Sequence, residues 1–408
     1  MIERVFAIIT RRSILQTAAG GLLMAGGGLL RPARAGLPSG AIESEMLDAL
    51  PGKQPLLKHS FRPPNYETPV GSFNDAITPN DRFFVRWHLA HIPEVDAASW
   101  RLNVAGDATE RPFALTFEQL KQEFEPVELV AVCQCAGNRR GFCDPHVAGV
   151  EWGDGAVGNA RWKGARLKDI LARAGLKQEA VEVAFNGADG PLLEATPDFI
   201  KSLPVWKAID DNTLVAYEMN GAPLPHWNGF PARIVVPGWA ATYWVKQLIS
   251  ISALAQPFKG YWMNSAYRVP KGKFPTVDRF LSQESETTTP ITEIDVNSLI
   301  ANISEGQRFR SGASIEIRGI AWDPGYGIGR VEVSLDGGSS WQSAALGPDL
   351  GRFSFRTWQL AFTPQRKGDM TIMPRAINAM GIAQTEAWIA NPAGYHNNVI
   401  QRIGIRVA

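Results

Sequence analysis

Cysteine is scarce in this chain. Three residues of 408 are cysteines, and all lie in one stretch of eleven positions, at Cys133, Cys135 and Cys143. An odd number of cysteines crowded together is a poor disulfide framework for so long a chain. The sequence contains no Cys-x-x-Cys-His haem site and no cysteine set for an iron–sulfur cluster. We therefore expect neither a disulfide scaffold nor a haem in this chain.

Net charge and long apolar runs are lacking too. The formal charge is +1, and the first 35 residues carry five arginines against one glutamate, which leaves −3 on the remainder. This balance does not indicate a nucleic-acid-binding protein. No segment has the length and apolar character of a transmembrane helix. We expect no membrane span in the mature chain.

The N-terminus has the pattern of an export signal. Arg11 and Arg12 precede a weakly hydrophobic, glycine-rich stretch that runs to Leu30, and Ala33-Arg34-Ala35 supplies small residues at a cleavage spacing. This pattern is typical of a twin-arginine signal over residues 1–35. An ordinary signal peptide or an uncleaved anchor is the alternative. Because the twin-arginine route carries folded proteins, it indicates a cofactor-bearing protein in a bacterial periplasm.

The rest of the chain divides by composition. Residues 36–80 are rich in proline, glycine and serine and predict an extended arm on the surface. Residues 81–285 mix strand patterns with two short helices, one starting at the capping box of Thr116 and one amphipathic over residues 164–176. Residues 286–408 contain short strands with turn signals, which favour an immunoglobulin-like sandwich. The predicted fold class is α+β, a mixed domain followed by an all-β domain.

Cys135 has the most informative surroundings. An apolar run, residues 127–132, leads into a turn of small residues, and Arg139 and Arg140 follow at once. A soft sulfur ligand beside fixed positive charge suits a metal centre that acts on an anion. A thiol in that setting also ionises more readily. For Cys133 and Cys143 we favour the simpler interpretation of small buried hydrophobes.

Two further segments carry side chains that suit the same site. Arg86 and His88 lie in an aromatic strand pattern, and Tyr267 lies in a second aromatic segment, residues 260–268. Each has a simpler interpretation, since Arg86 could pair with Asp81, and His88 and Tyr267 could be satisfied core residues. Taken alone, none of them is specific.

Taken together with the Cys135 turn, these segments match a family. Residues 135–140, Cys-Ala-Gly-Asn-Arg-Arg, resemble the molybdenum-ligand motif of the sulfite oxidase family of molybdopterin enzymes. The resemblance continues through residues 158–167, 216–221 and 229–238, and residues 331–338 resemble the start of that family's dimerisation domain. It covers most of residues 75–400. It implies that the mixed domain binds molybdopterin.

The resemblance also implies roles for single residues. Cys135 would be the thiolate on molybdenum. The substrate pocket would be formed by Arg86, His88, Arg140 and Tyr267. The pterin and its phosphate would be held by Phe84, Val85, Arg86, Trp87, His88, Asp189, Arg233, Trp244, Val245 and Lys246. Asn228 would join them, standing where animal sulfite oxidases carry a pterin-contacting histidine.

Besides Asn228, a second difference from animal sulfite oxidases concerns the charge of the substrate pocket. Residues 391–398 contain no arginine, although animal sulfite oxidases offer a pocket arginine in the corresponding stretch. We therefore expect a pocket with less positive charge, in which His88 is part of the replacement.

The implied function is oxidation of sulfite to sulfate by oxygen-atom transfer at a molybdenum–molybdopterin centre. With no haem motif in the chain, a c-type cytochrome is expected as electron acceptor, docked transiently or held as a subunit. A homodimer and a heterodimer with a haem subunit both stay open.

Three other functions are alternatives to sulfite oxidation. The first is a periplasmic molybdopterin reductase of a sulfoxide or nitrate. The second is a Cys-x-Cys copper carrier, which two thiolates would suit, and the third is a scaffold protein built on the sandwich domain.

Overall fold

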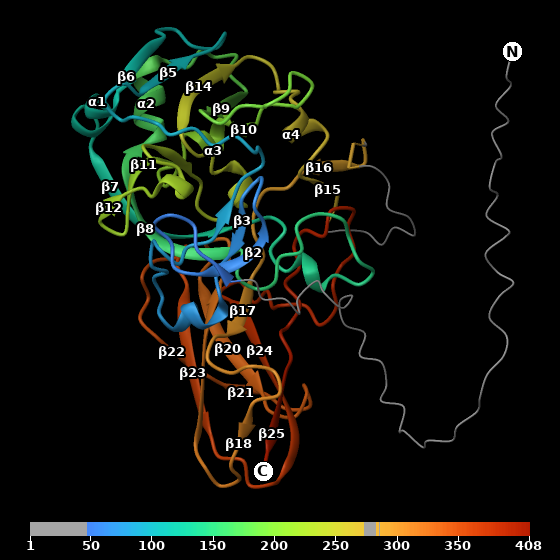
Figure 1. Cartoon of the computed structure of the whole chain (residues 1–408). Helices are drawn as coiled ribbons and strands as arrows, with labels where there is room; N and C mark the ends of the chain where they lie inside the picture. Colours follow the sequence, from blue (N-terminus) through green and yellow to red (C-terminus); the bar gives the residue numbers. More distant parts are fainter. Residues whose placement is uncertain (1–46, 273–282, 285) are drawn as a thin grey trace, which may run out of the picture. The chain divides into compact units, whose positions relative to one another are not determined.

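The structure, a computed structural model, describes residues 47–272, 283–284 and 286–408, so the predicted signal lies outside the described residues. Within these ranges the chain is mostly β-sheet with few, short helices (Figure 1). The α-helices are α1 (Phe117–Gln122), α2 (Leu167–Ala174), α3 (Val205–Ala208) and α4 (Tyr261–Asn264). Four 3-10 turns accompany them: η1 (Val70–Asn74), η2 (Arg140–Phe142), η3 (His226–Asn228) and η4 (Ala241–Tyr243). None of the helices in the described ranges has the length and apolar character needed to cross a membrane.

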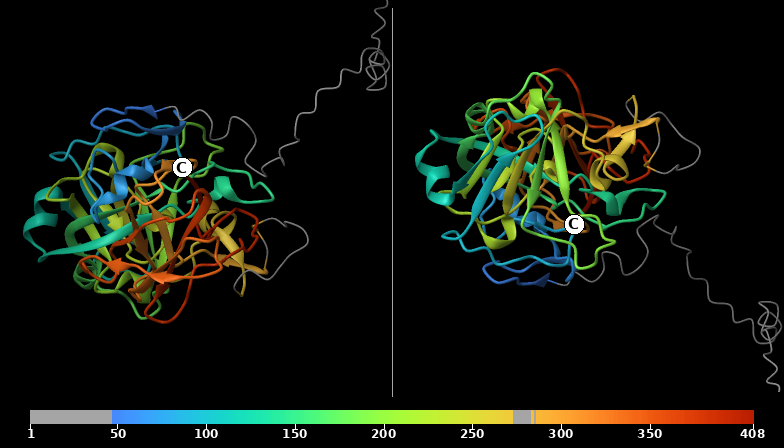
Figure 2. Two further views of the ribbon diagram at one scale, coloured as in Figure 1. Left: turned by 90° about the horizontal axis from the view of Figure 1, so that it is seen from below. Right: turned by 90° about the horizontal axis from the view of Figure 1, so that it is seen from above.

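Two five-stranded sheets form the part of the chain that carries the Cys135 motif. One has the order β10-β9-β14-β5-β6, with β5 (Arg101–Ala105), β6 (Phe113–Thr116), β9 (Glu182–Gly187), β10 (Ile200–Pro204) and β14 (Leu248–Leu254). The other has the order β12-β11-β8-β7, with β13 paired to β11; its strands are β7 (Pro126–Gln134), β8 (Val157–Arg166), β11 (Leu214–Met219), β12 (Ala222–Pro223) and β13 (Arg233–Val235). Seen from above, strands of this part fan out from one another, as expected of twisted sheets (Figure 2).

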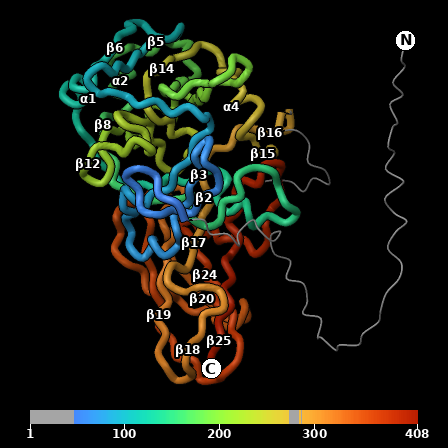
Figure 3. The backbone as a smooth tube through the Cα atoms, in the orientation of Figure 1, coloured from blue at the N-terminus to red at the C-terminus, as the bar shows by residue number. Residues whose placement is uncertain are grey.

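Within the segment predicted as a surface arm, residues 47–67 instead contribute strands to a sheet. Its strands β1 (Leu47–Asp48), β2 (Leu56–Ser60) and β3 (Asn65–Glu67) pair in order with β4 (Val85–Arg86). Figure 3 traces this blue stretch of backbone. Leu56 and Tyr66 are fully buried. The prediction was wrong because strands this short give no periodicity in sequence, and only pairing with β4 fixes them.

Two sheets build the C-terminal part. One has the order β17-β19-β23-β22 and comprises β17 (Asn297–Ile300), β19 (Ile315–Trp322), β22 (Ala345–Leu346) and β23 (Arg356–Phe362). The other has the order β18-β25-β24-β20-β21 and comprises β18 (Arg308–Phe309), β20 (Ile328–Ser334), β21 (Gln342–Ser343), β24 (Gly368–Asn378) and β25 (Ile403–Val407). A two-stranded ribbon, β15 (Arg268–Pro270) with β16 (Thr288–Pro290), precedes them. Side chains from both sheets, among them Ile317 and Val333, share one apolar core.

The two predicted helices form where their local signals lie. The Thr116 hydroxyl accepts from the Gln119 amide and the Gln119 side chain accepts from the Thr116 amide, which confirms the capping box of α1. In α2 the predicted apolar face is buried, and Gly175 ends the helix with a φ of +71°. Residues 164–166, predicted as the first turn of α2, belong to β8 instead.

Strand β7 is the element that positions the Cys135 turn. Its first half alternates between exposed and half-buried residues, and its last five residues are all buried. The C-terminal part covers that end, since the Val132 amide donates to the Phe353 carbonyl at 2.9 Å and Trp322 Nε1 donates to Gln134 Oε1 at 2.6 Å. The base of the turn is therefore fixed by two hydrogen bonds from outside its own sheet.

Candidate active site

Cys135 is the first residue after β7 and is held in a tight turn. Its amide donates to the Ala156 carbonyl at 2.9 Å, and its carbonyl accepts from the Asn138 amide at 3.0 Å. Cys135 is 6% exposed and lines a small pocket. Cys135 thus belongs to the buried core and also lines this pocket.

The pocket gathers residues from distant parts of the sequence. Its lining combines aromatic rings with cations and two thiols: Phe83, Phe84, Arg86, His88, Cys133, Cys135, Ala136, Phe199, Trp227, Asn228, Arg233, Ala241, Thr242, Trp244, Lys246 and Tyr267. One pocket is thus lined by the predicted residues Phe84, Arg86, His88, Cys135 and Tyr267.

The alternation of the strand around β4 decides which predicted residues face the pocket. Phe84, Arg86 and His88 line it, whereas Val85 and Trp87 pack into a separate apolar cluster. Successive side chains of an extended strand point to opposite sides, so the whole run could not contribute side chains to one site. The prediction that Val85 and Trp87 hold the cofactor finds no side-chain support here. The side chain of Val245, in the third predicted segment, likewise lies in the main core.

Arg86 reaches into the pocket from β4. Its Nη1 donates to Asn65 Oδ1 at 3.2 Å and to the Trp87 carbonyl, and its Nη2 lies 3.5 Å from the Tyr267 hydroxyl. None of the ion pairs between described residues includes Arg86, so the alternative pairing with Asp81 does not form. A guanidinium without an acidic partner can accept an anion.

His88 and Tyr267 form a hydrogen-bonded pair through His88 Nε2 and the tyrosine hydroxyl. The imidazole stacks on Phe199 with ring centres 3.7 Å apart. Burial lowers the pKa of His88 well below its usual value, and the nearby charges of Arg86, Lys246 and Lys201 lower it further. The imidazole is therefore neutral, and His88 does not supply the fixed charge that we expected from it.

Arg140 lies beside the Cys135 turn but outside the pocket lining. Its Nε donates to the Ala393 carbonyl at 2.8 Å and its Nη1 to the Val150 carbonyl at 3.0 Å. The guanidinium packs over Gly137, where an added Cβ would lie 2.5 Å from it. Its charge still lowers the pKa of Tyr267 against the larger effect of burial. Arg140 thus affects the pocket through its charge, without lining it.

A second group of cations lies beyond Cys133. Arg233 is buried and donates to the carbonyls of Asn228 (2.9 Å) and Trp244 (3.1 Å), while its Nε has no partner among the described residues. Burial, together with a smaller contribution from Arg233, lowers the pKa of Lys246 to about 7. Burial also raises the pKa of Asp189 to about 6, and the nearby Lys246 opposes that rise. Asp189 does not line the pocket, so it balances this charge from outside.

This arrangement fits a molybdenum–pterin cofactor. A thiol at the end of a strand offers one soft ligand for the metal. The unpartnered Nε of Arg233 and the unpartnered hydroxyl of Thr242 are buried donors in the same lining, beside the ammonium of Lys246. Buried donors without acceptors are costly in an empty protein and become favourable when an anionic group such as a phosphate binds.

Asn228 is tied down by a residue of the N-terminal sheet region. Lys53 Nζ donates to Asn228 Oδ1 at 2.6 Å, to the Asn80 carbonyl at 2.6 Å and to the Phe83 carbonyl at 3.0 Å. The Asn228 amide in turn donates to the Phe84 carbonyl at 3.2 Å. Lys53 therefore links one wall of the pocket to a segment that sequence reading had placed on the surface.

Lys53→Met is expected to lower the free energy of unfolding by about 2–4 kcal/mol, because it leaves buried acceptors without a donor. Urea unfolding followed by fluorescence measures the change. Lys58→Met is the matched control, since Lys58 forms a partly exposed pair with Asp48 at 2.8 Å, and such pairs contribute about 0–1 kcal/mol. Equal effects of the two substitutions would contradict the role of Lys53.

Sequence reading missed several residues of the site. Lys201, Phe199, Thr242 and Tyr395 lie in or against it, and no local pattern marks any of them. Cys133 did carry a signal, because residues two positions apart on a strand, such as Cys133 and Cys135, lie on the same face. It is buried, as expected, and it also lines the pocket.

Cys133 and Cys143 are expected to resist alkylation in the native protein. Burial raises the pKa of each thiol to about 11, so only about one in a thousand is a thiolate at pH 8. Mass spectrometry after iodoacetamide treatment should find both unmodified in the native state and modified after denaturation in guanidinium. Rapid native labelling at either position would show that the thiol is not buried as described.

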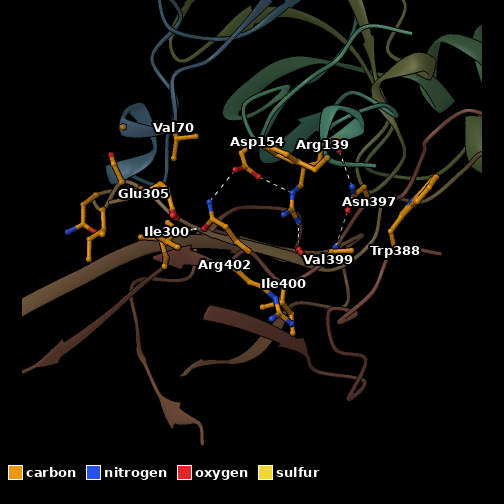
Figure 4. A pocket seen from close by; sticks show the side chains of 18 of the residues that line it. Val70, Arg139, Asp154, Ile300, Glu305, Trp388, Asn397, Val399, Ile400 and Arg402 are labelled. Atoms are coloured by element: carbon orange, nitrogen blue, oxygen red, sulfur yellow. Dashed lines mark hydrogen bonds and ion pairs between the residues drawn. The ribbon is translucent and has the colours of Figure 1, made fainter. Parts of the chain in front are cut away.

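The C-terminal part braces the Cys135 turn, a role that sequence reading did not assign to it. Asn397 Nδ2 donates to the Arg139 carbonyl at 3.0 Å, and Arg139 donates to the Val399 carbonyl and pairs with Asp154 at 2.9 Å (Figure 4). The backbone of Arg139 has a φ of 67°, a conformation that residues other than glycine rarely adopt without such support. Tyr395, from the same segment, stacks on Tyr267 with ring centres 5.6 Å apart.

Comparison with known proteins agrees with this site. Residues 88–262 match the oxidoreductase molybdopterin binding domain, and residues 288–408 match the Mo-co oxidoreductase dimerisation domain. The chain is 36% identical over 374 residues to mitochondrial sulfite oxidase of Homo sapiens, covering 88% of this chain and 67% of that protein. The chain belongs to the sulfite oxidase family.

Other members of the sulfite oxidase family match over similar lengths. Sulfite oxidase of Arabidopsis thaliana is 32% identical, covering 74% of this chain and 79% of the plant protein. Among solved structures, the sulfane dehydrogenase SoxCD of Paracoccus pantotrophus matches with a TM-score of 0.72 and 26% identity, covering 94% of this chain and 93% of that chain. The resemblance inferred from the Cys135 motif is thereby confirmed.

Proposed function

We propose that this protein oxidises sulfite to sulfate at a molybdenum–molybdopterin centre held by Cys135. The observation that carries the proposal is the pocket itself, in which the Cys135 thiol, the Tyr267 hydroxyl and the guanidinium of Arg86 lie together, the last without a carboxylate partner among the described residues. Sulfite is a small anion, and charge-assisted hydrogen bonds from arginine match its oxygens. The bound cofactor would supply the two-electron oxidation and the transferred oxygen atom.

The residues of the chain bind and orient the substrate. Arg86 would hold a sulfite oxygen through its fork of N–H groups. The Tyr267 hydroxyl would donate a hydrogen bond to the anion, with neutral His88 as its partner on the other side. The aromatic residues of the lining would exclude water from the anion, except for the water that the reaction consumes. The held cofactor phosphate would lie against Arg233 and Lys246.

The overall reaction converts sulfite and water to sulfate with release of two protons and two electrons. We propose that two molecules of a ferric c-type cytochrome each accept one electron. The match to the sulfane dehydrogenase SoxCD supports this acceptor, because that name describes a dehydrogenase and not an oxygen-consuming enzyme.

Three structural proposals accompany this function. The chain is exported through its twin-arginine pattern to a bacterial periplasm, with residues 1–35 as the signal. Residues 81–285 form the cofactor domain, and residues 286–408 form an immunoglobulin-like sandwich, for which the two facing sheets with one core are the support. That sandwich mediates either a homodimer or contact with a haem subunit, as its match to a dimerisation domain suggests.

The decisive experiment combines metal analysis with a turnover assay on the purified holoenzyme. We expect one molybdenum per chain and sulfite-dependent reduction of ferricytochrome c. Turnover of a sulfoxide or nitrate with a reduced dye, in the absence of sulfite turnover, would favour the reductase alternative. Bound copper without molybdenum would favour a carrier.

A further inference from the structure

Lys201 places a buried ammonium next to the proposed substrate pocket. The residue lies on β10 and is 0% exposed. Its Nζ donates to the Trp262 carbonyl at 2.5 Å, and none of the ion pairs between described residues includes it. A buried cation without a carboxylate partner costs stability. Burial lowers the pKa of Lys201 well below its usual value and Arg268 lowers it further, against the opposing effect of Glu182. The charged form is stabilised by the faces of two tyrosine rings and by the Trp262 carbonyl.

The ammonium lies between two tyrosine rings. Nζ is 4.7 Å from the ring centre of Tyr243 and 5.1 Å from that of Tyr267. Tyr243 is fixed, because its hydroxyl donates to the Ile291 carbonyl at 2.5 Å. Tyr267 is the ring whose hydroxyl meets His88 and Arg86. A cation over the face of a phenol draws electron density from the ring and makes its O–H a stronger donor.

The conformation of Tyr267 shows that it is held by its neighbours. Its φ is 59°, a region that bulky residues rarely occupy. Its ring stacks on Tyr395 and also contacts the ammonium of Lys201. The hydroxyl therefore has a defined position, which a hydrogen bond to a substrate needs.

We infer that Lys201 is a positioning residue for the substrate anion, acting through Tyr267, whose hydroxyl it orients and strengthens as a donor. The inference rests on the proposed function, which supplies the anion. The charge of Lys201 also acts on His88, the partner of the Tyr267 hydroxyl, as the smallest of the causes that lower the pKa of the imidazole, after burial, Arg86 and Lys246. The simpler alternative is that Lys201 only ties β10 to α4 through the Trp262 carbonyl.

Two substitutions in the holoenzyme separate these roles. Lys201→Met removes both the charge and the donor, whereas Lys201→Gln removes the charge and keeps a donor for the Trp262 carbonyl. If the charge acts on the anion, both variants should raise the KM for sulfite and the inhibition constant of sulfate by about tenfold, with kcat changed less. If Lys201 is only a structural tie, Lys201→Gln should restore the wild-type KM.

The matched control is Lys207→Met. Lys207 is also a buried lysine near an aromatic ring, with Nζ 5.9 Å from the ring centre of Trp239, but it pairs with Asp210 at 3.2 Å and lies outside the pocket lining. Its substitution should leave the KM for sulfite unchanged. A rise in KM equal to that of Lys201→Gln would overturn the inference.

A binding readout keeps this test independent of turnover. Sulfate should raise the thermal midpoint of the wild-type protein, and about tenfold more sulfate should be needed for the same rise in Lys201→Gln. If the wild type does not oxidise sulfite but this difference is seen, the proposed function fails and the role of Lys201 stands. Identical sulfate dependence in wild type and variant overturns the role of Lys201, whatever the turnover assay shows.

Discussion

Cys135→Ser is expected to lower the kcat for sulfite by at least about a thousandfold, equivalent to roughly 4 kcal/mol of lost catalysis. A serine hydroxyl stays protonated near neutral pH and is a hard ligand, so it cannot replace a thiolate on a soft metal site. The turn itself should survive, because its hydrogen bonds to Ala156 and Asn138 use only backbone atoms of residue 135. Steady-state turnover and the thermal midpoint, measured together, check both parts of the expectation.

Cys133→Ser is the matched control for that substitution. Cys133 lines the same pocket two residues earlier and is equally buried, but its thiol pKa of about 11 keeps it protonated. Its substitution should change kcat by less than about tenfold. The reverse pattern, with turnover lost on changing residue 133 and kept on changing residue 135, would move the ligand assignment to the other sulfur.

The parts of the fold that local signals specify were predictable. The capping box at Thr116 and the apolar face of α2 are interactions between residues three or four positions apart, so the sequence displays them directly. Within residues 286–408, the sequence has apolar or alternating patterns of strand length at 313–321, 329–335, 353–362 and 369–378, and the strands β19, β20, β23 and β24 lie there. Elements of two or three residues, such as β1 and β3, carry no such pattern.

The site was predictable where a motif carried it. The residues of the Cys135 turn, Arg86 and Tyr267 were found because several motifs in order match one family. Lys201 and Tyr395 were not found, because each reaches the pocket through a tertiary contact with Tyr267 that no spacing in sequence reports. The neutral state of His88 depends likewise on burial and on three cations from other segments.

Arg86→Gln is expected to raise the KM for sulfite, with a loss of about thirtyfold in kcat/KM, equivalent to about 2 kcal/mol of charge-assisted hydrogen bonding. Arg86 is the only guanidinium of the predicted substrate residues that lines the pocket of the described structure, since Arg140 is held behind the turn. Because neutral His88 supplies no compensating charge, the loss should fall mainly on binding of the anion. Initial rates over a wide range of sulfite concentrations separate KM from kcat.

The fold should tolerate this substitution, and a nearby arginine tests that point. Glutamine can still donate to the Trp87 carbonyl or to Asn65, the two acceptors that Arg86 Nη1 uses within the protein. Arg82→Gln is the control, since Arg82 lies four residues earlier, is exposed, and reaches only Ser72 Oγ at 3.5 Å. An unchanged KM in Arg86→Gln would remove Arg86 from the anion site, whereas an equal rise in both variants would show only a general effect of surface and pocket charge on sulfite.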